Sequence, residues 1–135
     1  MSSTNTSSNQ KGTRGQIEIF LYHAPKKNHD EMVEVNRQSR NFFTKHGASS
    51  FEVFSLDSRE NMMEFVNLSK TISASEEEEV WLEIQPYRDA EHVKEFATSM
   101  EDEKSIEPIY KRFMELITPG SIVTFGGFGK IEEIS

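Results

Sequence analysis

The chain contains no cysteine, which excludes disulfides, thiolate metal sites, iron–sulfur ligation and cysteine nucleophiles. It also lacks the Gly-x-Ser-x-Gly turn that presents the nucleophile of many serine hydrolases. Basic residues are few and scattered, since 15 Lys and Arg stand against 23 Asp and Glu and give a net charge of −8. Affinity for the phosphate backbone of nucleic acid depends on clustered Lys and Arg, so we do not expect nucleic acid as a partner.

Long apolar runs are missing as well. No stretch approaches the roughly 20 residues of a membrane span, so no membrane partner is expected. Residues 1–15 are polar and lack the apolar core of a secretory signal; they predict a disordered tail. Residues 16–135 have the length of one domain, and the cytoplasm is the expected location.

Neither a metal nor a cofactor is expected. No two histidines stand at i, i+4, and the acidic run at 76–79 lacks the ligand spacing and the glycine of a calcium loop. The glycine-rich run at 126–130 fails the phosphate-loop pattern because Ile131, not Ser or Thr, follows its lysine. Its glycines indicate either positive φ at a bulge or a close backbone approach across a dimer.

Residues that are present define six main elements. Alternating side chains predict strands over 16–23, 51–56 and 80–85, and a last strand over 121–125. Helical spacing and the N-caps Asn28 and Asp89 predict helices over 28–46 and 89–117, the second broken between Met100 and Ser105. Residues 57–79 are the least regular, with a helical turn at 62–68 and an edge strand at 71–74 expected. The order β-α-β-β-α-β predicts an α+β ferredoxin-like fold with an antiparallel sheet.

The alternation sorts strand residues into two sets. The first set is aliphatic and is expected to meet the helices: Ile17, Ile19, Leu21, Val80, Leu82 and Ile84. The second set is acidic and aromatic and is expected on the uncovered face: Glu18, Phe20, Tyr22, Glu52, Phe54, Trp81, Glu83 and Gln85. An uncovered aromatic face predicts an interface, so we expect a homodimer whose two sheets face each other as a dimeric α/β barrel.

Six residues of the second set form the candidate ligand site: Glu18, Phe20, Tyr22, Glu52, Trp81 and Glu83. Aromatic side chains would supply walls, and a partly buried carboxylate would have a raised pKa suited to proton transfer. The alternative is that these acids are solvated or hydrogen-bonded within the dimer interface. His23 is either a base at the pocket mouth or a strand-end residue bonded to the backbone.

Several short motifs together are similar to the bacterial YbaA-like family of uncharacterised proteins, over residues 16–131. The motifs are Ala24-Pro25, Lys26-Lys27-Asn28, His46-Gly47-Ala48, the run at 73–81, and Phe125-Gly126-Gly127-Phe128. The family usually has tyrosine at the place of Phe125 and aspartate at the place of Glu18. The resemblance implies the dimeric α/β-barrel superfamily, which includes cofactor-free monooxygenases and isomerases, but it implies no catalytic residue.

These observations predict a small cytoplasmic homodimer that binds a small apolar or aromatic molecule inside the barrel. One alternative is a cofactor-free monooxygenase or isomerase that acts on such a molecule. The other is a structural or regulatory homodimer without a ligand.

Overall fold

The computed structural model describes residues 13–134, so most of the predicted tail lies outside it. The elements in chain order are β1 (Gln16–Pro25), the 3-10 helix η1 (Lys26–Asn28), α2 (His29–Lys45), β2 (Glu52–Ser55), α3 (Leu68–Thr71), β3 (Glu78–Tyr87), α4 (Ala90–Met100), α5 (Glu107–Leu116), β4 (Thr124–Gly129) and the 3-10 helix η2 (Glu132–Ile134).

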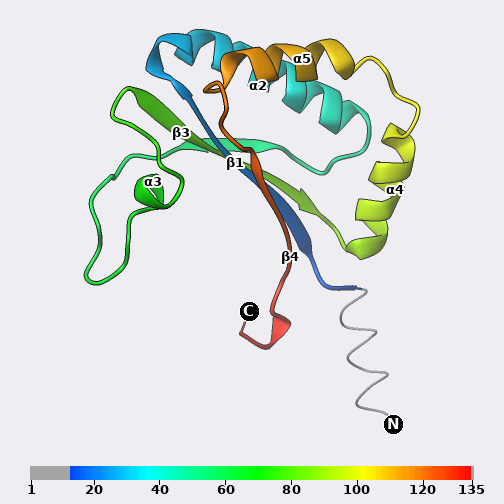
Figure 1. The fold of residues 1–135 in the computed structure, drawn as a ribbon. Coiled ribbons are helices and arrows are strands. Elements are labelled where there is room, and N and C mark those ends of the chain that lie inside the picture. Colours follow the sequence, from blue (N-terminus) through cyan, green and yellow to red (C-terminus); the bar gives the residue numbers. More distant parts are fainter. Residues whose placement is uncertain (1–12, 135) are drawn as a thin grey trace.

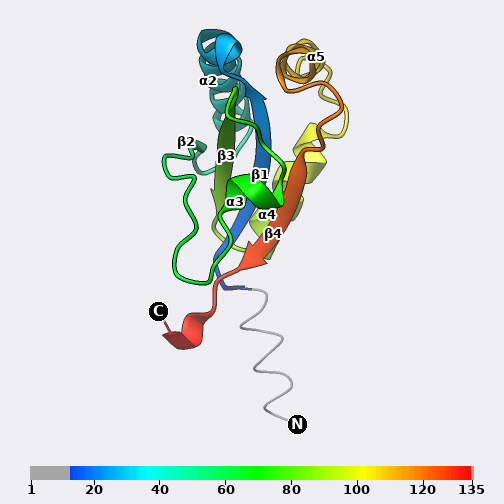
Figure 2. The same cartoon turned by 60° about the vertical axis from the view of Figure 1, so that its left-hand side comes forward.

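The four strands form one sheet in the order β2-β3-β1-β4, and every neighbouring pair is antiparallel. Helices α2 and α5 lie side by side over one face, and α4 lies at one end of it (Figure 1). The short α3 lies on the opposite face (Figure 2). This arrangement confirms the predicted α+β ferredoxin-like fold.

Local sequence explains where the main helices begin and end. Asn28 occupies the N-cap position of α2 as predicted, but its side chain donates to the Leu116 carbonyl at 2.9 Å and so ties α2 to α5. Asp89 caps α4 by accepting a hydrogen bond from the His92 backbone at 2.8 Å. The predicted break between the two C-terminal helices is confirmed, since α4 ends at Met100.

The prediction of which side chains meet the helices is wrong. The core under α2 and α5 contains Tyr22 and Trp81, which are almost completely buried, whereas the aliphatic Ile17 is 37% exposed. Alternation assigns residues to faces but does not say which face the helices cover. Each buried aromatic ring removes more apolar area from water than an aliphatic side chain, and this favours helices on the aromatic face.

The prediction that Glu52 and Phe54 share a face with Trp81 and Glu83 is also wrong. Glu52 lies opposite Ile84 and Phe54 lies opposite Leu82, so both belong to the aliphatic face. The four residues of β2 are too few and too mixed in polarity to indicate which of their side chains face the helices.

Two further expectations need correction. Strand β4 runs over Thr124–Gly129 and includes the glycines, none of which has positive φ; instead, a Cβ at Gly126 would approach the Phe128 ring within 2.9 Å. In the irregular stretch, residues 68–71 form α3 and no strand forms at 71–74. The Asn67 side chain starts this helix by accepting from the Ser69 backbone at 2.9 Å.

Candidate functional site

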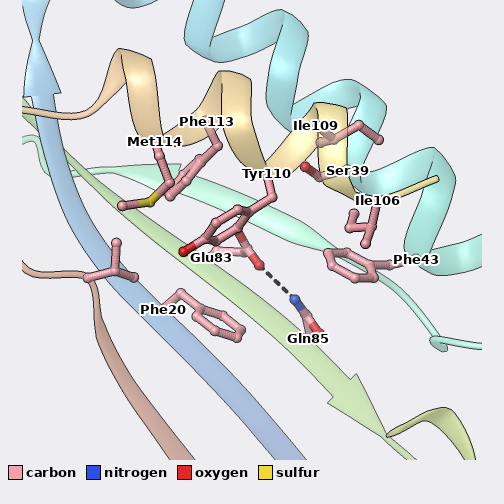
Figure 3. A pocket seen from close by; sticks show the side chains of 11 residues that line it. Phe20, Ser39, Phe43, Glu83, Gln85, Ile106, Ile109, Tyr110, Phe113 and Met114 are labelled. Atoms are coloured by element: carbon pink, nitrogen blue, oxygen red, sulfur yellow. Dashed lines mark hydrogen bonds between the residues drawn. The ribbon is translucent and has the colours of Figure 1, made fainter. Parts of the chain in front are cut away.

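A cavity of about 270 Å³ lies between the sheet and helices α2 and α5 (Figure 3). Its lining residues come from β1, α2, β3, α5 and the residues just before α5 and β4: Phe20, Ser39, Phe43, Glu83, Gln85, Ile106, Ile109, Tyr110, Phe113, Met114 and Val123. Tyr110 and Met114 are exposed to solvent, so the cavity opens beside α5. Of the residues that line it, only Glu83 and Tyr110 are ionisable, and the lining is otherwise largely apolar.

Glu83 is buried at the sheet side of this cavity. Burial raises the pKa of its carboxyl to about 7, although a hydrogen bond from Gln85 acts in the opposite direction. No Lys, Arg or His is among the cavity-lining residues in the described part of the chain. Glu83 therefore changes its protonation state close to neutral pH.

A chain of buried polar groups leads away from Glu83 along β3. Gln85 Nε2 donates to Glu83 Oε2 at 2.6 Å, and the Tyr87 hydroxyl donates to Gln85 Oε1 at 2.8 Å. Burial raises the pKa of the Tyr87 hydroxyl, and the charges of Glu18 and Glu83 raise it further. Tyr87 is thus a neutral hydrogen-bonding group near neutral pH.

A second buried tyrosine stands on the neighbouring strand. The Tyr22 hydroxyl donates to Asn36 Oδ1 at 3.1 Å, and Asn36 Nδ2 donates to the Met32 carbonyl at 3.0 Å. Burial raises the pKa of Tyr22, and the charge of Glu83 adds to this effect. This pair joins the sheet to α2 behind the cavity.

The structure brings together only part of the predicted ligand site. Phe20 and Glu83 line the cavity, and Tyr22 is packed beside them in the core. Trp81 is buried and borders a separate groove that includes Arg37. These residues lie on the helix-covered face of the sheet, so the prediction that they lie on its uncovered face is wrong.

The other two predicted residues lie away from this cavity. Glu18 is on the helix-covered face, opposite Gln85, and burial raises the pKa of its carboxyl. Glu52 is exposed on the opposite face of the sheet. Neither residue lines the cavity beside Glu83.

Most of the apolar lining comes from α5, whose sequence pattern predicts ordinary core. Ile106, Tyr110 and Phe113 follow one helical stripe, but Ile109 and Met114 widen it beyond what one packed face requires. The alternation predicts that Gln85 shares a face with Glu83, but it indicates no role for Gln85. The width of this apolar stripe is the feature of the sequence that could have indicated a cavity-lining helix.

His23 lies on the opposite face and bonds to side chains rather than to the cavity. Its Nδ1 is 2.6 Å from Glu78 Oε2 and 3.3 Å from Thr118 Oγ1. Burial would raise the pKa of Glu78, but hydrogen bonds from the Ser75 backbone, Thr118 and His23 outweigh it and lower the pKa to about 2. This cluster is a buried anion with several donors, unlike Glu83.

The described part of the chain has neither a metal-ligand cluster nor a membrane-spanning helix. Residues 13–134 contain no group of three or more His, Asp or Glu side chains arranged to hold a metal ion. None of the helices in this range is long and apolar enough to cross a membrane. The cytoplasmic location and the absence of a cofactor stay predictions.

No protein-family model matches the chain, and no curated protein matches it in sequence. Solved structures do resemble it. A variant of SnoaB, a cofactor-independent oxygenase from Streptomyces nogalater, is 11% identical with a TM-score of 0.54, over 87% of this chain and 94% of that one. A putative antibiotic biosynthesis monooxygenase from Nitrosomonas europaea is 11% identical with a TM-score of 0.54, over 90% and 93%.

A dimeric ferredoxin-like protein from an uncultured marine organism is 8% identical with a TM-score of 0.54, over 87% of this chain and 96% of that one. At these identities the likeness concerns the fold, and the resemblance to the YbaA-like family stays a prediction. The chain therefore shares the ferredoxin-like fold of these three structures.

Proposed function

We propose that the cavity binds a small, largely apolar molecule and that Glu83 exchanges a proton with it. The observation that carries this proposal is a single carboxyl with a pKa of about 7 in an otherwise apolar cavity. A proton-transfer group works best when its pKa is close to the working pH, because both protonation states are then populated. No structural need explains a buried carboxyl that has one hydrogen-bond donor and no ion pair among the described residues.

The size of the cavity limits the ligand. A cavity of about 150 Å³ takes up one benzene ring, so about 270 Å³ suits a molecule of two or three fused rings. Phe20, Phe43 and Phe113 supply flat apolar walls. The ligand needs one acidic C–H or O–H directed at Glu83, as in an enolisable ketone or a phenol.

The simplest reaction that fits is a tautomerisation. Ionised Glu83 takes a proton from a carbon next to a carbonyl, and the C–H electron pair becomes the double bond of an enolate. Protonated Glu83 then returns the proton to another atom of the same ligand. Atoms and electrons balance without a co-reactant, which suits a cavity whose only acid–base groups are Glu83 and Tyr110.

The experiment measures exchange of the α-protons of 2-tetralone, a two-ring ketone, in D₂O by NMR. We expect catalysed exchange with a midpoint near pH 7, and a loss of about 10²- to 10⁴-fold in Glu83→Gln. Glu79→Gln is the matched control, because Glu79 lies on the same strand but pairs with His29 outside the cavity. Equal rates in the Glu83→Gln variant and the wild-type protein would remove Glu83 from the proposal.

A second candidate is cofactor-independent oxygenation, favoured by the fold shared with SnoaB. Here the ligand, ionised by Glu83, would itself reduce O₂: a CH₂ group becomes a carbonyl, one oxygen atom enters the ligand and the other leaves as water. Oxygen uptake during turnover of a three-ring anthrone-type ketone supports this candidate. Turnover at the same rate without oxygen supports tautomerisation instead.

We further propose that the aliphatic face of the sheet pairs with a second copy of the chain. This face carries half-exposed aliphatic side chains together with Phe54 and Phe128, which are 48% and 52% exposed. An exposed apolar surface of this kind is typical of a protein interface, and a fold neighbour is described as dimeric. Pairing on this face leaves the Glu83 cavity on the outer side of each sheet.

The mass in solution tests the dimer. We expect a species of twice the 15.6 kDa chain mass, and its dissociation in Ile84→Glu, which places like charges across the two-fold axis. Ile122→Glu is the control because Ile122 is 82% exposed and lies outside the sheet. A monomeric wild-type protein would contradict the proposal.

A further inference from the structure

Three successive residues on one face of β3 are hydrogen-bonded in series: Glu83, Gln85 and Tyr87. Gln85 and Tyr87 are 3% and 4% exposed, so water cannot replace either bond. Figure 3 shows Gln85 beside Glu83 at the sheet side of the cavity. The carboxyl that faces the cavity is thus hydrogen-bonded to a buried amide, which is in turn hydrogen-bonded to a buried hydroxyl.

Each of these two groups can donate and accept. A primary amide has an N–H₂ side and a C=O side, and a tyrosine hydroxyl both donates and accepts. In the observed order, the amide donates to the Glu83 carboxylate and accepts from Tyr87. If the amide turns by 180°, protonated Glu83 donates to its carbonyl and the N–H₂ side donates to the Tyr87 oxygen. In both orders each of the three side chains keeps a hydrogen bond to its neighbour, but the second order leaves the Tyr87 O–H without its Gln85 acceptor.

The neighbouring tyrosine–amide pair does not have this freedom. Asn36 accepts from Tyr22, but its N–H₂ side donates to the Met32 main-chain carbonyl. A main-chain carbonyl can only accept, so it holds the Asn36 amide in one orientation. The two tyrosine–amide pairs differ in the group to which the amide donates. Asn36 donates to a main-chain carbonyl, whereas Gln85 donates to a carboxyl that titrates.

We propose that Gln85, held by Tyr87, is a positioning residue that turns with the protonation state of Glu83 and thereby stabilises both states. A site that takes a proton and returns it needs this property, because a fixed donor would stabilise the ionised carboxylate alone and oppose the return step. We call this protonation-linked turn of the Gln85 amide the switch. Its role in catalysis rests on the proposed function. The switch itself is a property of the protein without a ligand.

The groups that face Glu83 from each packed element do not supply this effect. From β1, Tyr22 bonds to Asn36, and Glu18 stands one position further along the sheet, opposite Gln85. Helix α2 contributes Ser39, whose hydroxyl donates to the Val35 carbonyl within the helix. Helix α5 contributes Tyr110, which is exposed at the mouth.

The test follows the Cζ carbons of ¹³C-labelled tyrosines by NMR as the pH is raised through 7. A through-space effect of the Glu83 charge would move the signals of Tyr22 and Tyr87 alike, since that charge raises the pKa of both. The charge of Glu18 also raises the pKa of Tyr87, so only the part of the change that has the midpoint of Glu83 is assigned to Glu83. The switch predicts that this part is larger at Tyr87 than at Tyr22. This change should vanish in both Glu83→Gln and Gln85→Leu.

Two variants measure the effect on Glu83 itself. In Gln85→Leu the ionised carboxylate loses its donor, so we expect its titration midpoint to rise by about one pH unit. In Tyr87→Phe the amide loses its holding partner, and we expect a smaller shift in the same direction. Tyr22→Phe is the control for removal of a buried tyrosine hydroxyl, because Tyr22 bonds to Asn36 and not to Gln85, and it should leave the midpoint within about half a pH unit.

The outcomes separate the two proposals. If Tyr22 and Tyr87 move equally, or if the Tyr87 change persists in Gln85→Leu, Gln85 is a fixed donor and the switch is wrong, whatever the 2-tetralone rates show. If the switch is present but 2-tetralone is not exchanged, the proposed function is wrong for this ligand. If both hold, the midpoint of the exchange rate against pH should move upward with Gln85→Leu.

Discussion

Two buried glutamates on the same strand, Glu78 and Glu83, have side-chain pKa values shifted in opposite directions. Both are 8% exposed and they lie on opposite faces of β3. Glu78 accepts hydrogen bonds from the Ser75 backbone, Thr118 and His23, and its pKa is lowered to about 2. Glu83 accepts from one neutral amide, and burial raises its pKa to about 7.

The comparison shows that burial alone does not decide the role of a carboxyl. The number and charge of its hydrogen-bond donors decide whether it is a permanent anion or a group that titrates near neutral pH. Glu78 joins β3 to β1 and to the turn after α5, whereas Glu83 faces a cavity. The first arrangement supports stability, and the second is the arrangement expected of a proton-transfer group.

The largest effect is expected when Glu78 loses its charge. Glu78→Gln leaves three donors without an anionic acceptor, so unfolding in urea at pH 7 should require about 3 kcal/mol less free energy. Because the folded pKa is lowered, the stabilisation by Glu78 is present above about pH 4.5 and is lost as pH falls toward 2. The variant should lack this acid-dependent loss.

Glu79→Gln is the control for that variant. Glu79 is the next residue on β3, and it bonds to His29, whose side chain is 51% exposed. An exposed pair of this kind contributes little, so its loss should cost less than about 1 kcal/mol. Equal losses in the two variants would contradict the difference drawn between a donor-rich buried anion and an ordinary surface pair.

Glu83→Gln should have the opposite sign. A raised folded pKa means that the folded protein binds this proton more tightly than the unfolded chain does. Stability from this group is therefore full below about pH 4.5, declines as pH rises toward 7, and stays reduced above 7. We expect the variant to be more stable than the wild-type protein by about 2 kcal/mol at pH 8, and equal to it at pH 4.

Urea unfolding at these two pH values checks the prediction. A variant that is less stable than the wild-type protein at pH 8 would show that the Glu83 carboxylate makes a net favourable interaction in the folded state. Glu83 would then belong to the same class as Glu78. The comparison between the two glutamates would fail at that point.

Thr118→Val tests the donor count more finely. The threonine hydroxyl donates to Glu78, while the Thr118 backbone donates to the His23 carbonyl at 3.0 Å and is unaffected by the change. Loss of one donor should raise the pKa of Glu78 by about one unit and reduce stability at pH 7 by about 1 kcal/mol. An acid-unfolding midpoint that does not move would assign the low pKa to Ser75 and His23 alone.

Much of the fold was predictable from the sequence, but the site was predictable only in part. Alternation correctly placed Tyr22, Trp81 and Glu83 on one face, because side chains in a strand alternate with a period of two. It could not tell which face the helices cover, since both sets are apolar enough to be buried. The donors of Glu78 come from residues 40 positions apart or more, apart from Ser75, and no local pattern reports such contacts.

The smallest effect on the pKa of either glutamate is expected for Tyr22→Phe, which removes a neighbour of Glu83 that is not one of its hydrogen-bond partners. The Tyr22 hydroxyl bonds to Asn36 and not to Glu83, so its loss should cost about 1 kcal/mol at every pH between 5 and 9. The titration midpoint of Glu83, followed by carboxyl-carbon NMR, should stay within about half a pH unit of the wild-type value. A larger shift would mean that the buried hydroxyl on β1 sets the pKa of Glu83 through space, and that counting hydrogen-bond donors is not sufficient to tell the two glutamates of β3 apart.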